Sequence, residues 1–450
     1  MYECKMPVMC TTALLFLTLH PSTGHNLWAT YQEGMSNPVR SKTINIMDYH
    51  AVPDGKTLNT KAVLAAISDA SQYNARTNNS GVNLYFPNNA NTDSNNVYLT
   101  APFNMTSSLT LTIQHGATLQ ATDDPTRWPV VPFLPSYGSG RDHPGPRRAP
   151  FIGGLHLSDV VITGGGTIDG QGQYWWARHR AGTEEKYTRG RLIEFLWTDG
   201  ILLDHITLIN SPFWTVHPTY STNVVARGLT ILNPVDSPNT DGFDPDSTIN
   251  VSLVDSYFSV GDDGVAIKSG WDCFGMDVGI PTANVHIRNL TVNSPSCAGV
   301  CIGSEMSGGV ENVLVEECQF LNVSSGLRIK AALGRGGYVR NVTYRNIDID
   351  NAIGWAIQAN DFYGSSNKAC HGREANAVPK ISDLRFENIT AHGTGNGANF
   401  VGLSTAFVRG VVLSNVTLLT QGKETYTCND TVGKYDAHCS PRPCRNFVPE

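Results

Sequence analysis

The sequence is poor in charge and has no surplus of basic residues. Only 16% of its 450 residues are charged, and 32 basic against 39 acidic side chains give a formal net charge of −7. Nucleic-acid binding depends on basic surfaces that neutralise phosphates, so no nucleic-acid partner is expected. Because 40% of the residues are hydrophobic, the chain can bury a substantial core, and global disorder is disfavoured.

Long apolar runs are missing after the first twenty residues. Lys5 precedes an apolar stretch over residues 8–19, and helix-breaking Pro21 and Gly24 follow it. About a dozen apolar residues suit a secretory signal peptide better than a membrane span, which needs roughly 20. We therefore expect residues 1–29 to be a signal peptide, and the mature protein to be extracellular or in a cell wall, away from membranes. A buried N-terminal helix is the alternative.

Paired CxxC motifs, which are typical of zinc sites, are also absent. Loss of the leader removes Cys4 and Cys10 and leaves an even number of cysteines, which favours disulfides in an oxidising compartment. Those that remain are Cys273, Cys297, Cys301, Cys318, Cys370, Cys428, Cys439 and Cys444. Their pairing stays open, although the last three could staple a C-terminal cap over residues 426–450.

Asn-x-Ser/Thr sequons give weak support for a secreted glycoprotein, because an Asn-rich chain produces several by chance. They begin at Asn78, Asn104, Asn250, Asn289, Asn322, Asn341, Asn388, Asn415 and Asn429.

Long helical patterns are scarce, and short alternating strands take their place. One phrase recurs, an Asn-Val start followed by apolar residues that alternate with polar ones. Its clear copies begin at Asn223, Asn250, Asn284, Asn312 and Asn341, which are 27, 34, 28 and 29 residues apart. A repeat of this length built from short strands is typical of a solenoid, in which stacked units share one core. An antiparallel sandwich would not need the constant repeat, so we predict an all-β parallel β-helix.

One helical pattern stands near the start of the chain. Apolar residues at 62, 63, 66, 67 and 70 have helical spacing, and Asn59 or Thr60 could cap the helix. A short N-terminal helix would cover the open end of the solenoid, where an exposed strand edge invites aggregation. We expect one β-helix domain over residues 41–425, with caps at both ends.

Acidic residues gather in one stretch, residues 239–244 (NTDGFD) followed by residues 261–264 (GDDG). Asp241 and Asp262 are 21 residues apart, about one short coil, and adjacent coils lie roughly 4.8 Å from each other. If Asp263 joins them, repulsion should raise the pKa of one carboxyl group and keep it protonated near neutral pH. A proton donor beside a charged base can cleave a glycosidic bond. Solvated turn aspartates or a calcium site are the alternatives.

Three cations follow this acidic stretch. Arg328 and Lys330 are two residues apart and so share one face of a strand, and Lys268 lies five residues beyond Asp263. Cations beside carboxylates on an acidic protein suggest an anionic sugar as substrate, because Arg can bind a carboxylate with two hydrogen bonds. Salt bridges to the same aspartates are the alternative.

Taken together, these motifs resemble those of the polygalacturonases of glycoside hydrolase family 28, in particular the plant-type and exo-acting branch. The ordered series Asn-Thr-Asp, Gly-Asp-Asp and Arg-Ile-Lys is specific in combination, and the similarity covers roughly residues 42 to 420. Further matching segments are VYLTAPF (97–103), GGTIDG (165–170), WW (175–176), SPFWTVHP (211–218), IGSEMSGG (302–309) and GRGG (334–337).

The resemblance implies a right-handed parallel β-helix that hydrolyses α-1,4 bonds of polygalacturonate with inversion. Asp262 would be the general acid, while Asp241 and Asp263 would hold and activate water. An inverting pair needs about 6.5–9.5 Å between carboxyl groups to admit that water. No metal and no organic cofactor is implied, and the protein is expected to be monomeric, with pectin or polygalacturonate as its partner.

The resemblance also assigns the substrate-binding residues. Arg328 and Lys330 match the family's binders of the substrate carboxylate, and Asn239 would orient the acidic cluster or a sugar hydroxyl. Lys268 is the third candidate among the cations.

One departure from the family pattern concerns a histidine. Most members carry Gly-His-Gly where this chain has Cys297-Ala298-Gly299. His217 is a candidate for part of the vacant space, with a structural or distal role as the alternative. Cys297 and Cys301 are expected to be structural, because no base that would activate a thiol is evident.

Three other functions stay open from the sequence. A hydrolase of rhamnogalacturonan or xylogalacturonan would keep the fold and change the sugar. A pectate lyase would need calcium ligands and a basic proton abstractor. A wall-binding β-helix that has lost its activity is permitted by the missing histidine, although the three retained aspartates speak against it. Whether attack begins at chain ends or inside the polymer is also open.

Overall fold

The computed structural model of the protein describes residues 35–88, 95–138, 145–183, 186–364, 376–422 and 424–450. Nearly all of them belong to one compact unit, Asn37–Glu450. The predicted signal peptide, with Cys4 and Cys10, lies outside the described residues, and so does Cys370.

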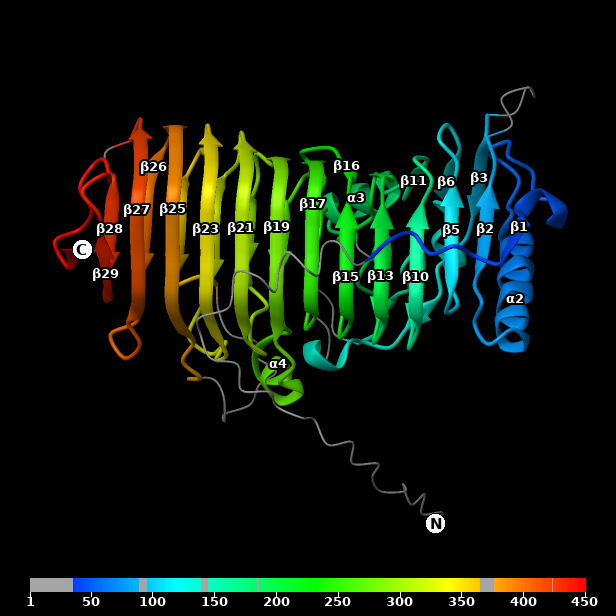
Figure 1. Ribbon diagram of the computed structural model, residues 1–450, viewed down its shortest axis with the longest axis horizontal. Helices are drawn as coiled ribbons and strands as arrows, with labels where there is room; N and C mark the ends of the chain where they lie inside the picture. Colours follow the sequence, from blue (N-terminus) through cyan, green and yellow to red (C-terminus); the bar gives the residue numbers. More distant parts are fainter. Residues whose placement is uncertain (1–34, 89–94, 139–144, 184–185, 365–375, 423) are drawn as a thin grey trace, which may run out of the picture. The chain divides into compact units, whose positions relative to one another are not determined.

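Parallel strands stacked side by side build this unit (Figure 1). The largest sheet has 19 strands. Its strands are β1 (Lys42–Asn45), β2 (Val82–Phe86), β3 (Val97–Thr100), β5 (Leu109–Ile113), β6 (Thr118–Ala121), β10 (Ser158–Thr163), β11 (Thr167–Asp169), β13 (Asp199–Asp204), β14 (Thr207–Ile209), β15 (Thr222–Arg227), β16 (Thr230–Leu232), β17 (Ile249–Ser259), β19 (Thr282–Asn293), β21 (Val310–Leu321), β23 (Tyr338–Asp350), β25 (Lys380–Thr394), β27 (Val408–Thr420), β29 (Thr431–Tyr435) and β30 (Phe447–Pro449).

A second set of short parallel strands, here called the short-strand sheet, runs along the solenoid beside the first. It consists of β4 (Phe103–Asn104), β9 (Ile152–Leu155), β12 (Ile193–Leu196), β18 (Val265–Ile267), β20 (Ala298–Ile302), β22 (Ser325–Lys330), β24 (Trp355–Asn360), β26 (Asn396–Val401) and β28 (Tyr426–Asn429). Isolated bridges join its two parts in the order Ile193, Val216, Phe243 and Val265. Successive passes through both sheets make the coils of a parallel β-helix, as predicted.

The remaining elements of the described residues are three helices, three short 3-10 turns and two short strands. They are η1 (Ile46–Tyr49), α2 (Thr60–Arg76), η2 (Pro125–Arg127), β7 (Val130–Val131), η3 (Pro135–Tyr137), β8 (Arg147–Arg148), α3 (Gln173–Arg180) and α4 (Asp272–Val278). Strands β7 and β8 form an antiparallel pair, in contrast to the parallel pairing of the coils.

The recurring Asn-Val phrase marks a turn that repeats from coil to coil. Asn223, Asn250, Asn284, Asn312 and Asn341 all have positive φ, between 53° and 62°, a conformation that asparagine tolerates better than most residues. From Asn250 onward, each side-chain amide also donates to the side-chain oxygen of the preceding asparagine in this series, at 2.8–3.1 Å. Asparagine recurs here because it meets both requirements, and the resulting ladder ties neighbouring coils together.

The predicted N-terminal helix is confirmed as α2, which covers the β1 end of the solenoid (Figure 1). Val63, Ala66, Ile67 and Ala70 are buried on its inner face, as the spacing predicted. Asn59 precedes the helix, but its side chain bonds the backbone of the preceding loop instead of capping the helix.

At the other end, residues 426–450 continue both sheets. Strand β28 pairs with β26, β29 pairs with β27, and Cys428 is joined to Cys444. Cys297, Cys301, Cys318 and Cys439 are free thiols, so the disulfides that the even cysteine count favoured are absent at these four described positions.

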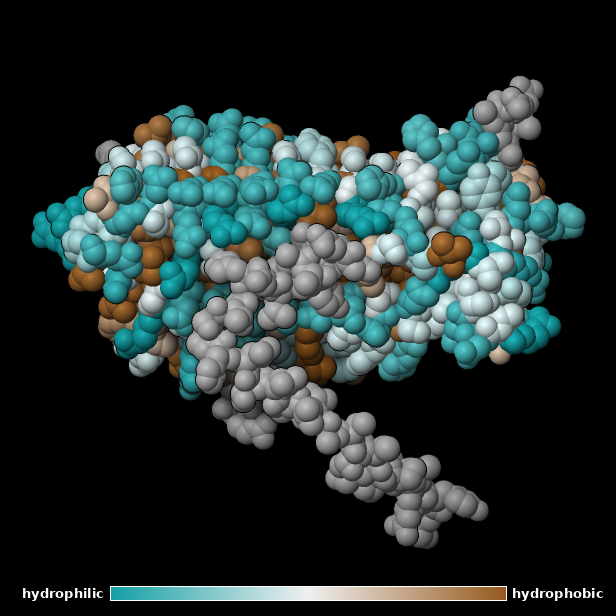
Figure 2. Space-filling view, viewed as in Figure 1, coloured by the Kyte–Doolittle hydropathy of each residue, from teal (hydrophilic) through white to brown (hydrophobic). Residues whose placement is uncertain are grey.

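The visible face of the unit is mostly hydrophilic, with scattered apolar patches (Figure 2). No helix among the described residues is long and apolar enough to span a bilayer.

One buried acid, Asp361, has no ion pair with any residue that the structure describes. Asp361 directly follows β24, its residue is 2% exposed, and one carboxyl oxygen receives no hydrogen bond from the described residues. Burial raises the pKa of Asp361 to about 7 from 3.8. Because the folded-state pKa exceeds that of the unfolded chain, Asp361 binds its proton more tightly in the fold, and stability falls as pH rises from about 4 to about 7.

We therefore expect Asp361→Asn to stabilise the protein at high pH and to change little near pH 4. The full difference amounts to at most about 4 kcal/mol, because one pKa unit corresponds to about 1.4 kcal/mol. Thermal melts of both proteins between pH 4 and pH 8 measure it. Asp350→Asn, at the exposed end of β23, is the control, and an equal melting difference at both pH values would contradict the prediction.

Candidate active site

The short-strand sheet presents two rows of side chains on its outer surface. Residues such as Val265 and Ile267 point into the core, so those between and after them point outward. Following the strand register, the first outer row is Glu194, His217, Asp244, Ala266, Cys301, Arg328, Gln358 and Asn399. The second outer row is Leu196, Thr219, Asp246, Lys268, Gly303, Lys330, Asn360 and Val401.

The three predicted aspartates lie in turns that lead into this sheet. Asp241 precedes the bridge residue Phe243, and Asp262 and Asp263 precede β18 in the next coil. The Gly242 N–H donates to the Asp263 carbonyl at 3.0 Å, which fixes the two turns side by side. The residues Asp241 and Asp263 are each 2% exposed, while Asp262 is only half-buried. The predicted convergence of the acidic residues is therefore present, with Asp262 as its most accessible member.

Asp263 is held as a carboxylate. One oxygen contacts the Lys330 ammonium, and the other accepts a hydrogen bond from the Ala298 N–H at 3.0 Å. Burial alone would favour the neutral acid, but the charge of Lys330 outweighs it and holds the pKa of Asp263 below its ordinary value. Asp263 in turn keeps the pKa of the buried Lys330 well above the ordinary value for lysine.

Asp241 is in the opposite situation. Burial and the charges of Asp262 and Asp244 raise the pKa of Asp241 well above its ordinary value, and Lys268 opposes them only in part. The Lys268 ammonium is shared among three carboxyl groups, at 3.6 Å from Asp241, 3.5 Å from Asp244 and 3.1 Å from Glu305. As predicted, one carboxyl group of the cluster is favoured in its protonated form, and that group is Asp241.

Asn239 connects the acidic cluster to an arginine. Its side-chain amide donates to Asp262 at 3.3 Å, and its oxygen accepts from Arg189 at 2.7 Å. Arg189 also donates to the backbone carbonyls of Pro212 and Pro238, and it lies 4.7 Å from the centre of the Phe213 ring. Asn239 is therefore held in one orientation toward Asp262.

Arg328 is the partly exposed cation of the site. Its guanidinium lies 4.9 Å from the centre of the Tyr363 ring, and Lys330 lies 5.4 Å from the same ring. Lys330 is buried, so Arg328, Asn239, Asp262 and Tyr363 form the accessible part of the site.

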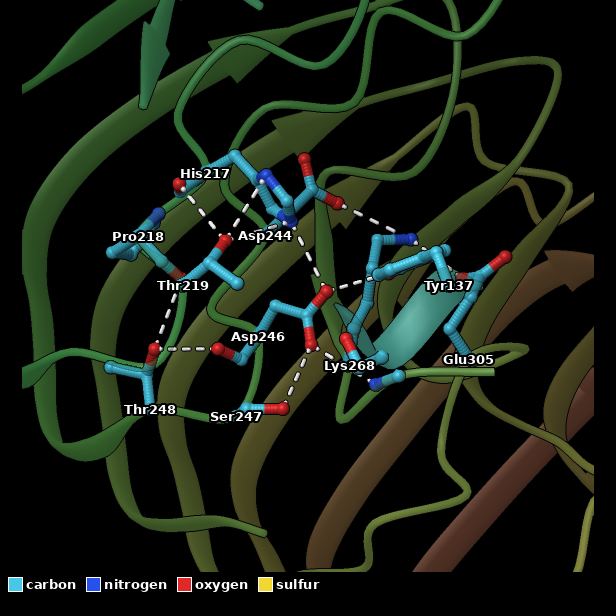
Figure 3. A network of polar contacts seen from close by, with 12 residues as sticks. Tyr137, His217, Pro218, Thr219, Asp244, Asp246, Ser247, Thr248, Lys268 and Glu305 are labelled. Atoms are coloured by element: carbon cyan, nitrogen blue, oxygen red, sulfur yellow. Dashed lines mark hydrogen bonds and ion pairs between the residues drawn. The ribbon is translucent and has the colours of Figure 1, made fainter. Parts of the chain in front are cut away.

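His217 lies in a fully buried network beneath this surface (Figure 3). Its Nδ1 is 2.9 Å from Glu194 and its Nε2 is 3.2 Å from Asp246, which also accepts a hydrogen bond from the Tyr137 hydroxyl at 2.6 Å. With no exposed surface, the ring has no direct contact with a substrate in this arrangement. Lys268 is 3% exposed and fully engaged, so direct substrate binding does not fit it either.

Arginines neutralise the far side of this network. Arg147 lies 2.5 Å and Arg191 3.5 Å from Glu194. Burial would raise the pKa of Glu194, but the two guanidinium groups outweigh it and hold that pKa well below the ordinary value. Both ring nitrogens of His217 thus face carboxyl groups, Glu194 on one side and Asp246 on the other.

Cys297 stands beside the acids where most relatives are expected to carry histidine. One ligand atom each of Asp262, Asp263 and Cys297 lie within 4.8 Å of one another. Burial and the charges of the two aspartates raise the pKa of Cys297, so it stays a neutral thiol. The residues fit a calcium site poorly, because both oxygens of Asp263 are already engaged by Lys330 and a backbone N–H.

The coils before the acidic cluster are covered. In the two outer rows, Glu194, His217, Asp244, Asp246 and Lys268 are all at most 3% exposed. The cover is a cluster of Leu134, Tyr137, Phe213, Trp214 and Tyr220, to which η3 contributes, and η3 packs against α4. Beyond the cluster, Arg328, Gln358, Asn360 and Asn399 are partly exposed. The sheet surface is thus closed on one side of the acids and open, among the described residues, on the other.

Sequence reasoning missed several members of the site. Asp244 and Glu305 were visible in their motifs but received no role, because their distance from Lys268 depends on the coil register. Arg189 and Tyr363 gave no signal, since each stands outside a recognisable motif and reaches the site only through the fold.

Comparison with known proteins agrees with this geometry. The family description "Glycosyl hydrolases family 28" matches residues 78–439. The chain is 41% identical over 409 residues to a probable polygalacturonase of Vitis vinifera, covering 90% of this chain and 80% of the relative. It is 31% identical over 324 residues to an endo-polygalacturonase of Pectobacterium carotovorum, covering 68% of this chain and 75% of the relative.

Solved structures with the same fold include two polygalacturonases. The exopolygalacturonase of Thermotoga maritima superposes with a TM-score of 0.73 at 26% identity, covering 91% of each chain. The polygalacturonase of Erwinia carotovora gives a TM-score of 0.70 at 25% identity, covering 89% of this chain and 97% of that structure. The coils are therefore those of a right-handed parallel β-helix, and the chain belongs to glycosyl hydrolase family 28, as a pectin hydrolase of the polygalacturonase type.

Proposed function

We propose that this protein is an exo-acting polygalacturonase that hydrolyses α-1,4-galacturonosyl bonds by acid–base catalysis with inversion. Asp262 is the general acid, and Asp241 and Asp263 hold the attacking water. Arg328 binds the substrate carboxylate, and Lys330, which is buried against Asp263, adds its positive charge from beneath the surface. The observation that carries this proposal is the convergence of three carboxyl groups beside two cations on a partly exposed surface.

Accessibility supports the division of roles among the acids. Asp262 is the half-buried one, so it is the carboxyl group that can approach a glycosidic oxygen. Asp263 is held ionised by Lys330, which suits a group that accepts a hydrogen bond from water. Asn239 donates to Asp262 and so fixes its direction.

Inversion rests on the family resemblance and receives no support from the carboxyl separation. Asp262 and Asp263 have oxygens within 4.8 Å of each other, closer than the roughly 6.5–9.5 Å typical of inverting pairs. The anomeric form of the first product, followed by proton NMR, tests inversion directly.

Exo action is supported by the one-sided cover over the sheet. A polymer that crosses the site needs an open surface on both sides of the scissile bond, while a chain end needs only one. Tyr137 of η3 and the aromatic cluster around it occupy the side of Asp246 and His217, and the side of Gln358 and Asn399 is partly exposed. Chain ends therefore fit this surface better than chain interiors.

Secretion and a monomeric state stay predictions. They rest on the leader-like residues 1–29 and on the composition of the chain.

Replacing the proposed acid tests the assignment. We expect Asp262→Asn to lower reducing-sugar release from polygalacturonate by about 10²–10⁴-fold, because an amide cannot protonate the leaving oxygen. Binding of the polymer should persist. Asp350→Asn, an exposed change elsewhere, should leave release unchanged. Equal release by Asp262→Asn and the unaltered protein would exclude Asp262, and binding without release by the unaltered protein would indicate an inactive wall-binding protein.

The pattern of early products tests exo action. We expect galacturonate monomers from the first minutes, with slow loss of polymer viscosity, because the covered side leaves no path for the chain interior. Size separation of the products together with viscometry measures both. A mixture of oligomers and a rapid fall in viscosity would show endo action instead.

The charge of Arg328 should matter only for charged substrate. We expect Arg328→Gln to raise KM for polygalacturonate about 10–100-fold, because a charged hydrogen bond contributes roughly 1.5–3 kcal/mol. On a highly methyl-esterified polymer the effect should shrink. Arg340→Gln, whose partner Glu311 lies on the neighbouring strand, is the control. The same loss on both polymers would contradict a carboxylate-binding role.

A further inference from the structure

Asp244 has an exceptional environment for a buried acid. Its residue is 0% exposed, and neither carboxyl oxygen receives a hydrogen bond from an N–H group or a hydroxyl of the described residues. Its nearest cation, Lys268, lies 3.5 Å away, and Glu305 contacts the same ammonium (Figure 3). Asp241 also lies 3.6 Å from this ammonium. A carboxylate without hydrogen bonds in such a place is costly, so a partner is needed.

The partner that the geometry offers is Asp241. It lies three residues earlier in the same turn, contacts the same ammonium, and also has one oxygen without a hydrogen bond from the described residues. If Asp241, Asp244 and Glu305 were all ionised around Lys268, the buried group would carry two uncompensated negative charges. One proton between Asp241 and Asp244 removes one of these charges and supplies the missing hydrogen bond.

We propose that Asp244 is a positioning residue, which shares one buried proton with Asp241 above the Lys268 ammonium and so sets the pH range in which Asp241 can activate water. With the proton on Asp244, Asp241 is a carboxylate that can accept a proton from water. With the proton on Asp241, that function is blocked. The inference rests on the proposed function for its catalytic consequence, but not for the shared proton.

The charged groups around Asp241 and Asp244 determine the direction in which the pKa of each acid is shifted. Asp241 faces Asp262 and Asp263, whose charges favour its neutral form, and Lys268, which favours its ionised form. Burial raises the pKa of Asp244 to about 6, and Asp263 acts in the same direction. The charges of Lys268 and His217 and a hydrogen bond from Asp241 act against this increase.

Two further groups act through Lys268. Glu305 accepts a hydrogen bond from that ammonium at 3.1 Å and neutralises part of its charge. Cys301 is the neighbour of Ala266 in the first outer row. Burial is the main reason why the pKa of its thiol lies far above the ordinary value. The thiol therefore adds no charge near neutral pH.

The decisive variant is Asp244→Asn, which imitates the protonated form of Asp244 and keeps its shape. The amide can donate to Asp241, and the negative charge is gone, so the pKa of Asp241 should fall. We expect the acidic limb of the kcat profile to move down by about one pH unit or more, with KM changed less than threefold. Unchanged position of that limb in an active Asp244→Asn protein would overturn the proposal.

Asp246→Asn is the matched control. Asp246 lies two residues further along the same segment and is equally buried, but its partners are Tyr137, His217 and the Gly270 N–H, not Lys268. A purely structural loss should lower the melting temperature of both variants. Only Asp244→Asn should move the acidic limb, and a similar shift in both would overturn the proposal.

Glu305→Gln keeps the proposal testable if Asp244→Asn does not fold. This substitution removes one of the three carboxylates around Lys268, so the ammonium stabilises the ionised forms of Asp241 and Asp244 more strongly. The acidic limb of the kcat profile should therefore again move to lower pH. A limb that moves upward or stays in place would count against the shared proton.

An infrared titration separates this inference from the proposed function. Both proteins carry Asp361→Asn in this titration, because Asp361 is another buried acid that stays protonated above pH 5. In that background, the protein with Asp244 should show the C=O band of a buried protonated carboxyl group above pH 5, and Asp244→Asn should lose that band at a lower pH. If pectin hydrolysis is absent but the band behaves in this way, the shared proton stands and the proposed function fails. If hydrolysis is present but the band is missing from both proteins, the shared proton fails alone.

Discussion

The hydrogen-bonded register between neighbouring coils is the constraint on which this site depends. Parallel pairing places equivalent residues of successive coils roughly 4.8 Å apart, whatever the length of chain between them. Glu194, His217 and Asp244 become lateral neighbours in this way, although 23 and 27 residues separate them in the sequence. The Asn ladder and the backbone pairing hold that register along the solenoid, so a single register slip would separate the acids from the cations.

The coil register brings charged groups together, but it does not by itself determine which carboxyl groups stay ionised. Lys330 faces Asp263 almost alone, so that acid stays ionised, while Lys268 divides its charge among three carboxyl groups. Two similar buried lysines thus produce opposite outcomes for Asp263 and Asp241. The difference is one of stoichiometry, because three carboxyl groups surround Lys268 and one contacts Lys330.

Repeating local features could be predicted from the sequence, and features that depend on distant segments could not. The solenoid, helix α2 and the meeting of Asp241 with Asp262 and Asp263 follow from periodicity, helical spacing and coil length. The burial of His217 did not follow, because it depends on Tyr137, which reaches Asp246 across 109 residues of sequence. Tyr363 could not be predicted for a similar reason, because only the fold brings its ring to Arg328. The free thiols Cys301 and Cys318 show that an even cysteine count does not reveal whether two cysteine side chains face each other.

The same distinction separates the chemistry of the site from its mode of attack. The carboxyl groups come from turns of the repeat itself, which any chain with this register would bring together. The cover over the neighbouring coils combines Phe213, Trp214 and Tyr220 of one coil with Leu134 and Tyr137 at η3, a short segment between strands that packs against α4. Such segments can lengthen or shorten without disturbing coil pairing, since connections tolerate change better than the elements they join. In the proposed function, the solenoid positions the carboxyl groups that cleave the bond, and the connection that carries η3 contributes to limiting access of the polymer. Asp246 links the solenoid to one of its connections. It belongs to the repeat, and it accepts a hydrogen bond from the hydroxyl of Tyr137 in η3.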